Sequence, residues 1–363
     1  MNLLFLREFH HTLGARFSEL NGQEIVADYG DGPAEYQALW QSAVVLDFSF
    51  RGRICLIGAD RVRFLHGQIT NDVKKLHLGE GCYAALTNAK GKMEADLNVF
   101  NLPDELLLDF EPGLIERVSQ RLERFIVADD VQIVNAAPHY GLLSVQGPKS
   151  REILKAVGLL DTAQAPGYSV AKIADPTLGE IYVAVLRRLA LPGFDVFVPN
   201  ESLAALADKL IAAAKSVGGR ACGWTAFETA RIEAGVPRFG ADIDETNLPM
   251  ECIADRAMSF NKGCYIGQEV LNRIHTIGRV TRELRGLRLA DGLKTLPNKG
   301  ATLFHNGKES GYITSAVRSL TLNTNIALGY VRRDANQIGT QLTLQTPEEN
   351  SPVTITELPF VKR

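Results

Sequence analysis

Reactive side chains are concentrated in one short stretch, Lys262-Gly263-Cys264-Tyr265-Ile266-Gly267-Gln268-Glu269. It combines a thiol, an ammonium, a carboxylate and an amide with two glycines, which let the backbone turn or approach a ligand closely. Lys262 is two residues from Cys264, and a nearby cation favours the thiolate, the form that acts as a nucleophile or metal ligand. The alternative is a surface turn with a semi-buried cysteine. That alternative requires two glycines and four reactive or polar side chains to coincide by chance.

A carboxylate at the end of a predicted helix is the second candidate. The helix begins near Thr225 and stops at Gly235 and Pro237, so Glu233 lies in its last turn. The macrodipole is negative there, and a carboxylate in that position costs about 0.3–1 kcal/mol. A partner must offset this cost. The partner can be a side chain, either Arg231 or a surface lysine. The alternative partner is a ligand that presents adjacent N–H donors.

The elements that must position these residues alternate without the strict order of a doubly wound sheet. Residues 53–57, 83–87 and 93–100 read as strands, and the last two form a hairpin around a glycine-containing turn. An amphipathic helix is predicted within residues 114–126. Beyond Arg273, short β-type runs separated by turns predict a small antiparallel barrel. The fold class is therefore α+β.

Composition limits the classes of function. The 363 residues suggest two or three domains. With 39 Lys and Arg against 42 Asp and Glu, the net charge of -3 gives no electrostatic footprint for direct binding of nucleic acid or of a membrane surface. No apolar run approaches the length of a membrane span. The 5 cysteines are scattered and include no Cys-x-x-Cys pair, so we expect a reducing cytoplasm, no metal site and no permanent iron–sulfur cluster.

The stretch Lys-Gly-Cys-Tyr-x-Gly-Gln-Glu resembles the signature of the YgfZ family of folate-binding proteins, which are relatives of the glycine-cleavage T-protein (GcvT). The likeness extends over nearly the whole chain, including Arg231-Ile232-Glu233-Ala234-Gly235. It implies a GcvT-like three-lobed ring with two interleaved α+β subdomains, a C-terminal antiparallel β-barrel and tetrahydrofolate near the centre. The implied boundaries are a folate-binding region over 1–274, with subdomain A about 1–50 and 136–245 and subdomain B about 51–135, and a barrel over 275–363.

The resemblance also implies roles for individual residues. Glu233 corresponds to the glutamate that holds the pterin ring, with Arg231 in the same segment, and Tyr83 and Asp96 line the folate site. In the T-protein the aspartate belongs to an Asp-Asp pair, whereas here Ala95 precedes Asp96, which argues against aminomethyl transfer. Cys264 and Lys262 become the catalytic candidates of the motif. Its remaining members are Gly263, Tyr265, Gly267, Gln268 and Glu269.

Three functions follow from these residues and from the resemblance. The first is a folate-binding accessory factor that supports assembly or repair of iron–sulfur clusters in client enzymes, including those that modify tRNA. The second is a tetrahydrofolate-dependent one-carbon transferase. The third, direct RNA binding, is disfavoured by the charge balance. The first hypothesis predicts that Cys264 and Glu233 face one central cavity, with the iron–sulfur clients as transient partners.

Overall fold

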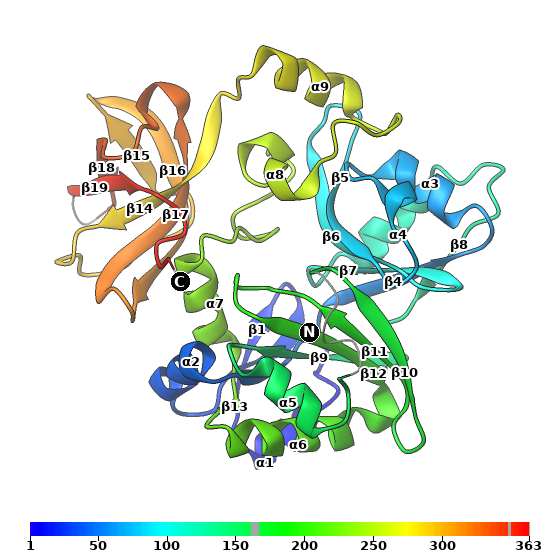
Figure 1. Cartoon of the computed structure of the whole chain (residues 1–363). Helices are drawn as coiled ribbons and strands as arrows, with labels where there is room; N and C mark the ends of the chain where they lie inside the picture. The colour runs from blue at the N-terminus through cyan, green and yellow to red at the C-terminus, as the bar shows by residue number, and fades with distance from the viewer. Residues whose placement is uncertain (161–166, 348–349, 363) are drawn as a thin grey trace. The chain divides into compact units, whose positions relative to one another are not determined.

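The computed structural model describes residues 1–160, 167–347 and 350–362 (Figure 1). The chain forms two compact units. Unit 1 comprises Met1–Leu86, Ala95–Phe227 and Asn261–Tyr265. Unit 2 comprises Thr87–Glu94, Glu228–Phe260 and Ile266–Arg363. Each unit is thus assembled from three separate stretches of the chain.

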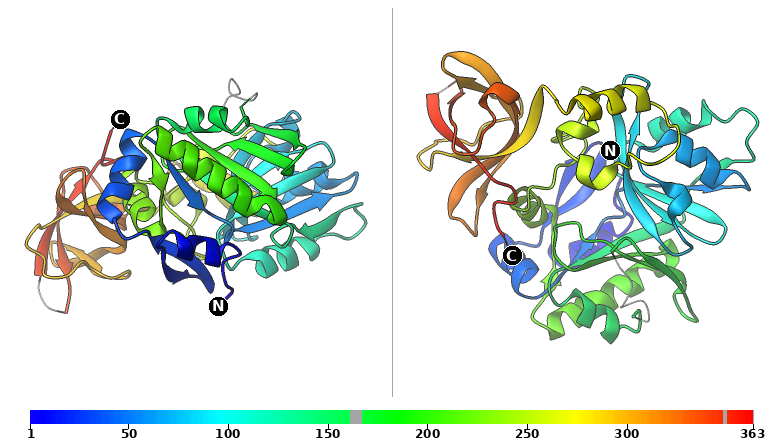
Figure 2. Two further views of the ribbon diagram at one scale, coloured as in Figure 1. Left: turned by 90° about the horizontal axis from the view of Figure 1, so that it is seen from below. Right: turned by 45° about the horizontal axis from the view of Figure 1, so that its top comes forward.

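The larger sheet of unit 1 has six strands in the order β10-β11-β12-β9-β3-β13. Helices α5 (Ser150–Ala156) and α6 (Asn200–Ser216) cover one face of it (Figures 1 and 2). Because side chains alternate along a strand, Leu143 and Val196 enter the core under these helices while Ser144 and Asp195 point to the other face. The strands are β3 (Val44–Asp47), β9 (Tyr140–Gln146), β10 (Val170–Asp175), β11 (Gly179–Val185), β12 (Gly193–Pro199) and β13 (Arg220–Ala221).

The first elements of the chain also belong to unit 1. They are α1 (Arg7–Thr12), β1 (Arg16–Leu20), β2 (Gln23–Asp28) and α2 (Gly32–Gln41). Strands β1 and β2 pair in a separate antiparallel hairpin. Its two turn residues, Asn21 and Gly22, have φ angles of 50° and 80°, which match the tight turns that join antiparallel strands.

A second, five-stranded sheet has the order β5-β6-β7-β4-β8. Ile54 and Leu56 enter a core beneath α3 (Arg61–Gln68) and α4 (Ile115–Glu123), while Arg53 and Cys55 alternate to the opposite face. The hairpin and the amphipathic helix predicted from the sequence are confirmed, with the helix shorter than expected. The strands are β4 (Gly52–Ile57), β5 (Gly81–Thr87), β6 (Met93–Asn101), β7 (Glu105–Phe110) and β8 (Gln132–Asn135), and a 3-10 turn, η1 (Val73–Lys75), follows α3.

The predicted barrel of unit 2 is confirmed as a closed ring of six antiparallel strands, β14-β17-β16-β15-β18-β19. Its interior is filled by branched side chains such as Leu303, Ile313 and Val331. The strands are β14 (Arg282–Leu289), β15 (Thr302–His305), β16 (Lys308–Ser319), β17 (Thr324–Arg332), β18 (Gln341–Gln345) and β19 (Asn350–Thr356). The helices and 3-10 turns are α7 (Trp224–Glu233), which starts in unit 1, η2 (Pro249–Glu251), α8 (Ala254–Ala257), α9 (Gln268–Ile277) and η3 (Arg333–Ala335).

Strand β16 contains a bulge that brings two hydroxyl groups together. Its pairing register with β17 shifts between Ile313 and Ser315, so Thr314 is an extra residue in the strand. As a result the neighbouring hydroxyls of Thr314 and Ser315 both donate to Asp242 Oδ1, at 2.6 and 2.7 Å. In a regular strand, two consecutive side chains would point to opposite faces.

Candidate functional site

Lys262 is the first residue of the loop that carries the motif 262–269, and it holds the start of that loop in place within unit 1. Its ammonium donates to the backbone carbonyls of His66 at 2.6 Å, Ile69 at 2.6 Å and Asn71 at 2.8 Å. Burial lowers the pKa of Lys262 to about 8, so the ammonium is still the main form at pH 7. These carbonyls lie at the end of α3 and just beyond it, where a cation also complements the helix dipole. All three N–H donors are used, so any effect of Lys262 on Cys264 is restricted to its charge.

The rest of the loop leaves Cys264 exposed, while the side chains of Lys262 and Tyr265 on either side of the Gly263-Cys264 pair are buried. Cys264 is solvent-exposed, whereas Lys262 and Tyr265 are 8% and 7% exposed. In unit 2, Gly267 has a φ of 90°, and a Cβ there would lie 2.6 Å from the Asn88 carbonyl oxygen, so only glycine fits. Gln268 opens α9 and Glu269 lies in its first turn, where an acidic side chain is favourable. Buried anchors therefore present a free thiol, and Gly263 beside it is also exposed.

Replacing Lys262 with methionine is expected to lower the free energy of unfolding by about 2–3 kcal/mol, because it leaves carbonyl groups near the end of α3 unsatisfied. Urea denaturation measures this loss. The matched control is Lys172→Met, which breaks an exposed pair with Glu180 at 2.8 Å and should change stability by less than about 1 kcal/mol. Equal effects of the two substitutions would contradict the anchoring role.

Asp96 and Tyr83 meet on the hairpin strands of unit 1. The Tyr83 hydroxyl donates to Asp96 Oδ2 at 2.6 Å. Burial, together with the charge of Glu111, raises the pKa of Asp96 to about 6. A carboxylate with that pKa can accept or release a proton near neutral pH. The residue before it, Ala95, is buried in the core of the sheet and supplies no second acid.

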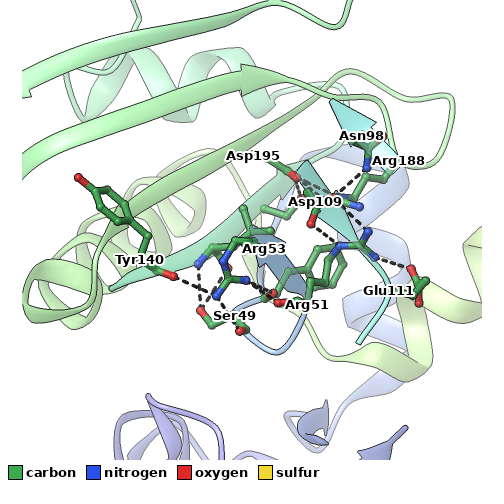
Figure 3. A network of polar contacts seen from close by, with 12 residues as sticks. Ser49, Arg51, Arg53, Asn98, Asp109, Glu111, Tyr140, Arg188 and Asp195 are labelled. Carbon is green, nitrogen blue, oxygen red and sulfur yellow. Dashed lines mark hydrogen bonds and ion pairs between the residues drawn. The ribbon is translucent and has the colours of Figure 1, made fainter. Parts of the chain in front are cut away.

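A buried network of charges lies between the inner faces of the two sheets of unit 1 (Figure 3). Arg51 donates to both oxygens of Asp109, at 2.8 and 3.0 Å, and also to Glu111. Arg188 donates to Asp109 at 2.9 Å and to Asp195 at 3.0 Å. Although burial alone would raise it, the pKa of Asp109 is held well below its usual range by these two guanidinium groups.

Arg53 lies beside this network, and within the described part of the chain its hydrogen bonds go to backbone carbonyls and not to a carboxylate. Its terminal nitrogens donate to the backbone carbonyls of Phe48, Arg51, Ser49 and Tyr140. Burial lowers the pKa of Arg53 to about 10. Sequence reasoning identified none of these arginine and acid residues as a site. The available signal was charge on otherwise apolar strands, such as Arg53 in 53–57 and Asp109 beside Phe110.

Glu233 is the last residue of α7 and is 0% exposed. The Ser319 hydroxyl donates to its Oε1 at 2.5 Å, and the Thr321 N–H donates to the same oxygen at 3.4 Å. The partner considered from the sequence, Arg231, instead pairs with Glu228 and Asp242. The cost of placing a carboxylate at the end of this helix is therefore offset within unit 2. The compensating groups are a hydroxyl at the end of β16 and an N–H group in the turn after it.

Arg231 is buried in unit 2 and hydrogen-bonded to its neighbours there. It is 2% exposed, and its five N–H donors have partners: two bonds to Glu228, and one each to Val236 O, Asp242 and Ser315. All five donors are used within the chain, and the cofactor-binding role that the resemblance implies for Arg231 stays a prediction. Asp242 also accepts from the two hydroxyls of the β16 bulge. Arg231 thus joins α7 to the barrel.

The six catalytic and cofactor-binding candidates belong to different units, and Lys262 is in unit 1. Asp96, Tyr83 and Cys264 belong to unit 1, and Glu233 and Arg231 belong to unit 2. The expectation that Cys264 and Glu233 share one cavity stays a prediction. Within the described ranges, no group of three or more His, Cys, Asp or Glu side chains is arranged to hold a metal ion. The same ranges contain no helix that is long and apolar enough to cross a membrane.

Comparison with known proteins places the chain in a family. Among curated relatives, the aminomethyltransferase of Geobacillus sp. (strain WCH70) is 27% identical, over 98% of this chain and 97% of the relative. The aminomethyltransferase of Symbiobacterium thermophilum is 29% identical, over 98% and 96%. Among solved structures, the glycine cleavage system aminomethyltransferase T from Bartonella henselae has the same fold, with a TM-score of 0.89 at 23% identity over 99% of this chain and 98% of that one.

The family models agree with this fold. The GCVT N-terminal domain matches residues 6–262, and the glycine cleavage T-protein C-terminal barrel domain matches residues 282–362. The sequence-based assignment to the wider T-protein group is confirmed, while the narrower YgfZ assignment stays a prediction. This chain belongs to the glycine cleavage T-protein family.

Proposed function

We propose that this chain is a folate-binding accessory factor of the YgfZ type that supports iron–sulfur clusters in client enzymes, including enzymes that modify tRNA. The observation that carries the proposal is the exposed thiol of Cys264, held on a loop between the buried Lys262 and Tyr265. A thiol presented in this way can contact a client's cluster or attack an electrophile without a cluster site in the chain itself. The absence of an acid at Ala95 agrees with a role other than aminomethyl transfer.

Two residues of unit 1, Asp96 and Tyr83, support the proposal that the chain binds a folate. A pterin presents N–H donors and ring nitrogens, and Asp96 offers a buried carboxylate whose pKa of about 6 suits both accepting a hydrogen bond and moving a proton. Tyr83 orients that carboxylate through its 2.6 Å hydrogen bond. Bound tetrahydrofolate supplies a one-carbon carrier. For Glu233, a pterin donor would have to share or replace the Ser319 hydroxyl at Oε1.

The test is complementation of a strain that lacks this protein. Cys264→Ala and Cys264→Ser are both expected to abolish support of client activity, since a hydroxyl does not replace a thiolate. The free energy of unfolding should change by less than about 0.5 kcal/mol, because the side chain is exposed. Full complementation by either variant would disprove the thiol role.

A second candidate is a tetrahydrofolate-dependent one-carbon transferase. It is favoured by the buried Asp96 with its raised pKa and by the names of the curated relatives. The discriminating assay is formation of methylene-tetrahydrofolate from a methylamine donor by the purified chain.

If this second function holds, the pH dependence identifies the base. Asp96 is ionised only above its pKa of about 6, so the rate should rise through pH 6 and level off above it. Asp96→Asn should remove that rise and slow the reaction roughly a hundredfold. An unchanged profile in the variant would exclude Asp96 as the base, and no product with the unaltered chain would exclude the transferase.

A further inference from the structure

Unit 1 contains a cavity of about 390 Å³ between its two sheets, a volume in the range of small-molecule sites. Its lining comes from β4, β7 and β8 of the five-stranded sheet and from β9, β11 and β12 of the larger sheet. The side chains of Val134 and His139 in this lining are exposed, so the cavity opens to solvent. The apolar part of the lining consists of Ile57, Leu102, Leu107, Val134, Ala136 and Phe197.

The cavity and Asp96 lie at opposite ends of strand β7. Glu105, the first residue of β7, lines the cavity. Glu111, which follows the last residue of β7, is the acid whose charge acts on Asp96. Glu105 and Glu111 are six positions apart in the sequence. At about 3.3 Å per residue they are separated by about 20 Å, so the cavity is distinct from the place where folate binding is proposed.

Glu105 brings a carboxylate into this mainly apolar lining. Its side chain is half-buried, and within the described part of the chain no lysine, arginine or histidine forms an ion pair with it. Burial and the charge of Glu105, to which the thiol also donates, raise the pKa of Cys55. The thiol therefore stays protonated and leaves the negative charge in place. A carboxylate in apolar surroundings is stabilised by pairing with a cation.

Two tyrosine rings line the cavity together with Glu105. Tyr140 and Tyr182 meet edge to face, with ring centroids 5.9 Å apart. Burial raises the pKa of both phenols, and the charges of Glu180 and Glu105 raise it further. The rings therefore lie in a region of negative potential. Aromatic faces in such a region attract an ammonium group.

A lysine of the chain already uses this combination of groups at the next position. The Lys172 ammonium lies 5.8 Å from the centroid of the Tyr182 ring and pairs with Glu180 at 2.8 Å. The Tyr182 hydroxyl donates to the same carboxylate at 2.9 Å. The cavity offers a second ring and a second acid, Tyr140 and Glu105. Among the described residues, no lysine or arginine lies over that ring or pairs with that acid.

Arg53 also lines the cavity, but its charge is balanced on the side of the buried network. Its terminal nitrogens donate to four backbone carbonyls. The charges of Asp109, Asp47 and Asp195 act on its guanidinium group. Its Nε has no hydrogen-bond partner among the described residues, and protein atoms cover it. In Figure 3 the Tyr140 side chain points away from this network.

We propose that the cavity binds a small organic cation, an ammonium group carried on an apolar body. The ammonium pairs with Glu105 beside the two tyrosine rings, and the apolar body packs against Leu107 and Phe197. A neutral ligand leaves the carboxylate without a cation, and an anion is repelled by it. The inference goes beyond the proposed support of iron–sulfur clusters and does not depend on Cys264.

Isothermal titration calorimetry of the full chain with three matched compounds tests the inference. Phenethylamine carries the ammonium, phenylethyl alcohol replaces it with a hydroxyl, and phenylacetate replaces it with a carboxylate. Phenethylamine is expected to bind about tenfold more tightly than either of the others. Glu105→Gln should weaken the binding of phenethylamine about tenfold and leave that of phenylethyl alcohol unchanged. The control Glu123→Gln, at an exposed position of α4, should change neither.

Four results would overturn the inference. They are no binding of phenethylamine, equal affinities for the three compounds, an unchanged affinity in Glu105→Gln, and tighter binding of phenylacetate, which would assign the cavity to an anion.

If Glu105→Gln does not fold, Val134→Trp carries the test. Val134 is 40% exposed on the edge strand β8, and an indole at this position should fill the cavity and abolish binding of phenethylamine. Retained binding in that variant would also contradict the inference. Calorimetry with these compounds involves neither folate nor a client, so its failure is distinguishable from complementation by Cys264→Ala.

Discussion

Replacing Arg51 with methionine is expected to lower the free energy of unfolding by about 3–5 kcal/mol, the usual effect of leaving a buried charge without its partner. Arg51 holds both oxygens of Asp109, which is 0% exposed, and also Glu111, which is 5% exposed. Methionine fills a similar volume but donates no hydrogen bond, and among the described residues Asp109 then keeps a bond from Arg188 and an amide bond from Asn98. Urea denaturation read by tryptophan fluorescence suits this measurement, because both tryptophans, Trp40 and Trp224, belong to unit 1.

The matched control for Arg51 is Arg16→Met. Arg16 also pairs with an aspartate, Asp28, at 2.6 Å, but its side chain is 67% exposed, so the loss should stay below about 1 kcal/mol. Adding Asp109→Asn to Arg51→Met should recover part of the stability, since it removes the stranded charge. If Arg51→Met behaves like the control, the network contributes nothing to holding the sheets of unit 1.

Arg231→Met should have a similar effect, about 3–5 kcal/mol, in unit 2. The substitution removes all five hydrogen bonds of a side chain that is 2% exposed and leaves Asp242 buried with the hydroxyls of Thr314 and Ser315. Those hydroxyls can donate to the carboxylate but cannot neutralise it. Hydrogen exchange read by mass spectrometry should show faster exchange in peptides from α7 and β16.

The control for Arg231 is Lys362→Met, which breaks an exposed pair with Glu357 at 2.6 Å. It should leave exchange in α7 and β16 unchanged. The double variant Arg231→Met with Asp242→Asn should be more stable than Arg231→Met alone. Equal exchange in Arg231→Met and the control would mean that the helix is joined to the barrel by other contacts.

The fold can be predicted well from the sequence, because the residue patterns that specify helices and strands are local. The β-type runs beyond Arg273 give a barrel, and the apolar stripe within residues 114–126 gives α4. Helix boundaries are less accurate. The helix expected to begin near Thr225 starts at Trp224, and the amphipathic stripe that reaches Ile126 outlasts the helix, which ends at Glu123. Short-range spacing fixes the existence of an element, while its ends depend on contacts made elsewhere in the fold.

The candidate site is less predictable, because its contacts join distant parts of the chain. The stretch around Cys264 is recognisable from its residue types. The hydrogen-bond partners of the Lys262 ammonium are not, since they lie 191 to 196 positions earlier in the chain. Arg231 looks like a ligand residue in the sequence, yet three of its bonds go to Asp242, Val236 and Ser315. The same limit hides the link between Arg51 and Asp109, which are 58 positions apart.

The large sequence separation between Lys262 and the carbonyls that it binds has a consequence for the synthesis of the protein. When Asn71 is added to the growing chain, the lysine that will satisfy its carbonyl is still 191 residues away from being added. At about 5–20 residues per second, that interval lasts roughly 10–40 s. Throughout this time the nascent chain must keep the carbonyls near the end of α3 hydrated. Unit 1 therefore reaches its final form only after most of the protein has been translated.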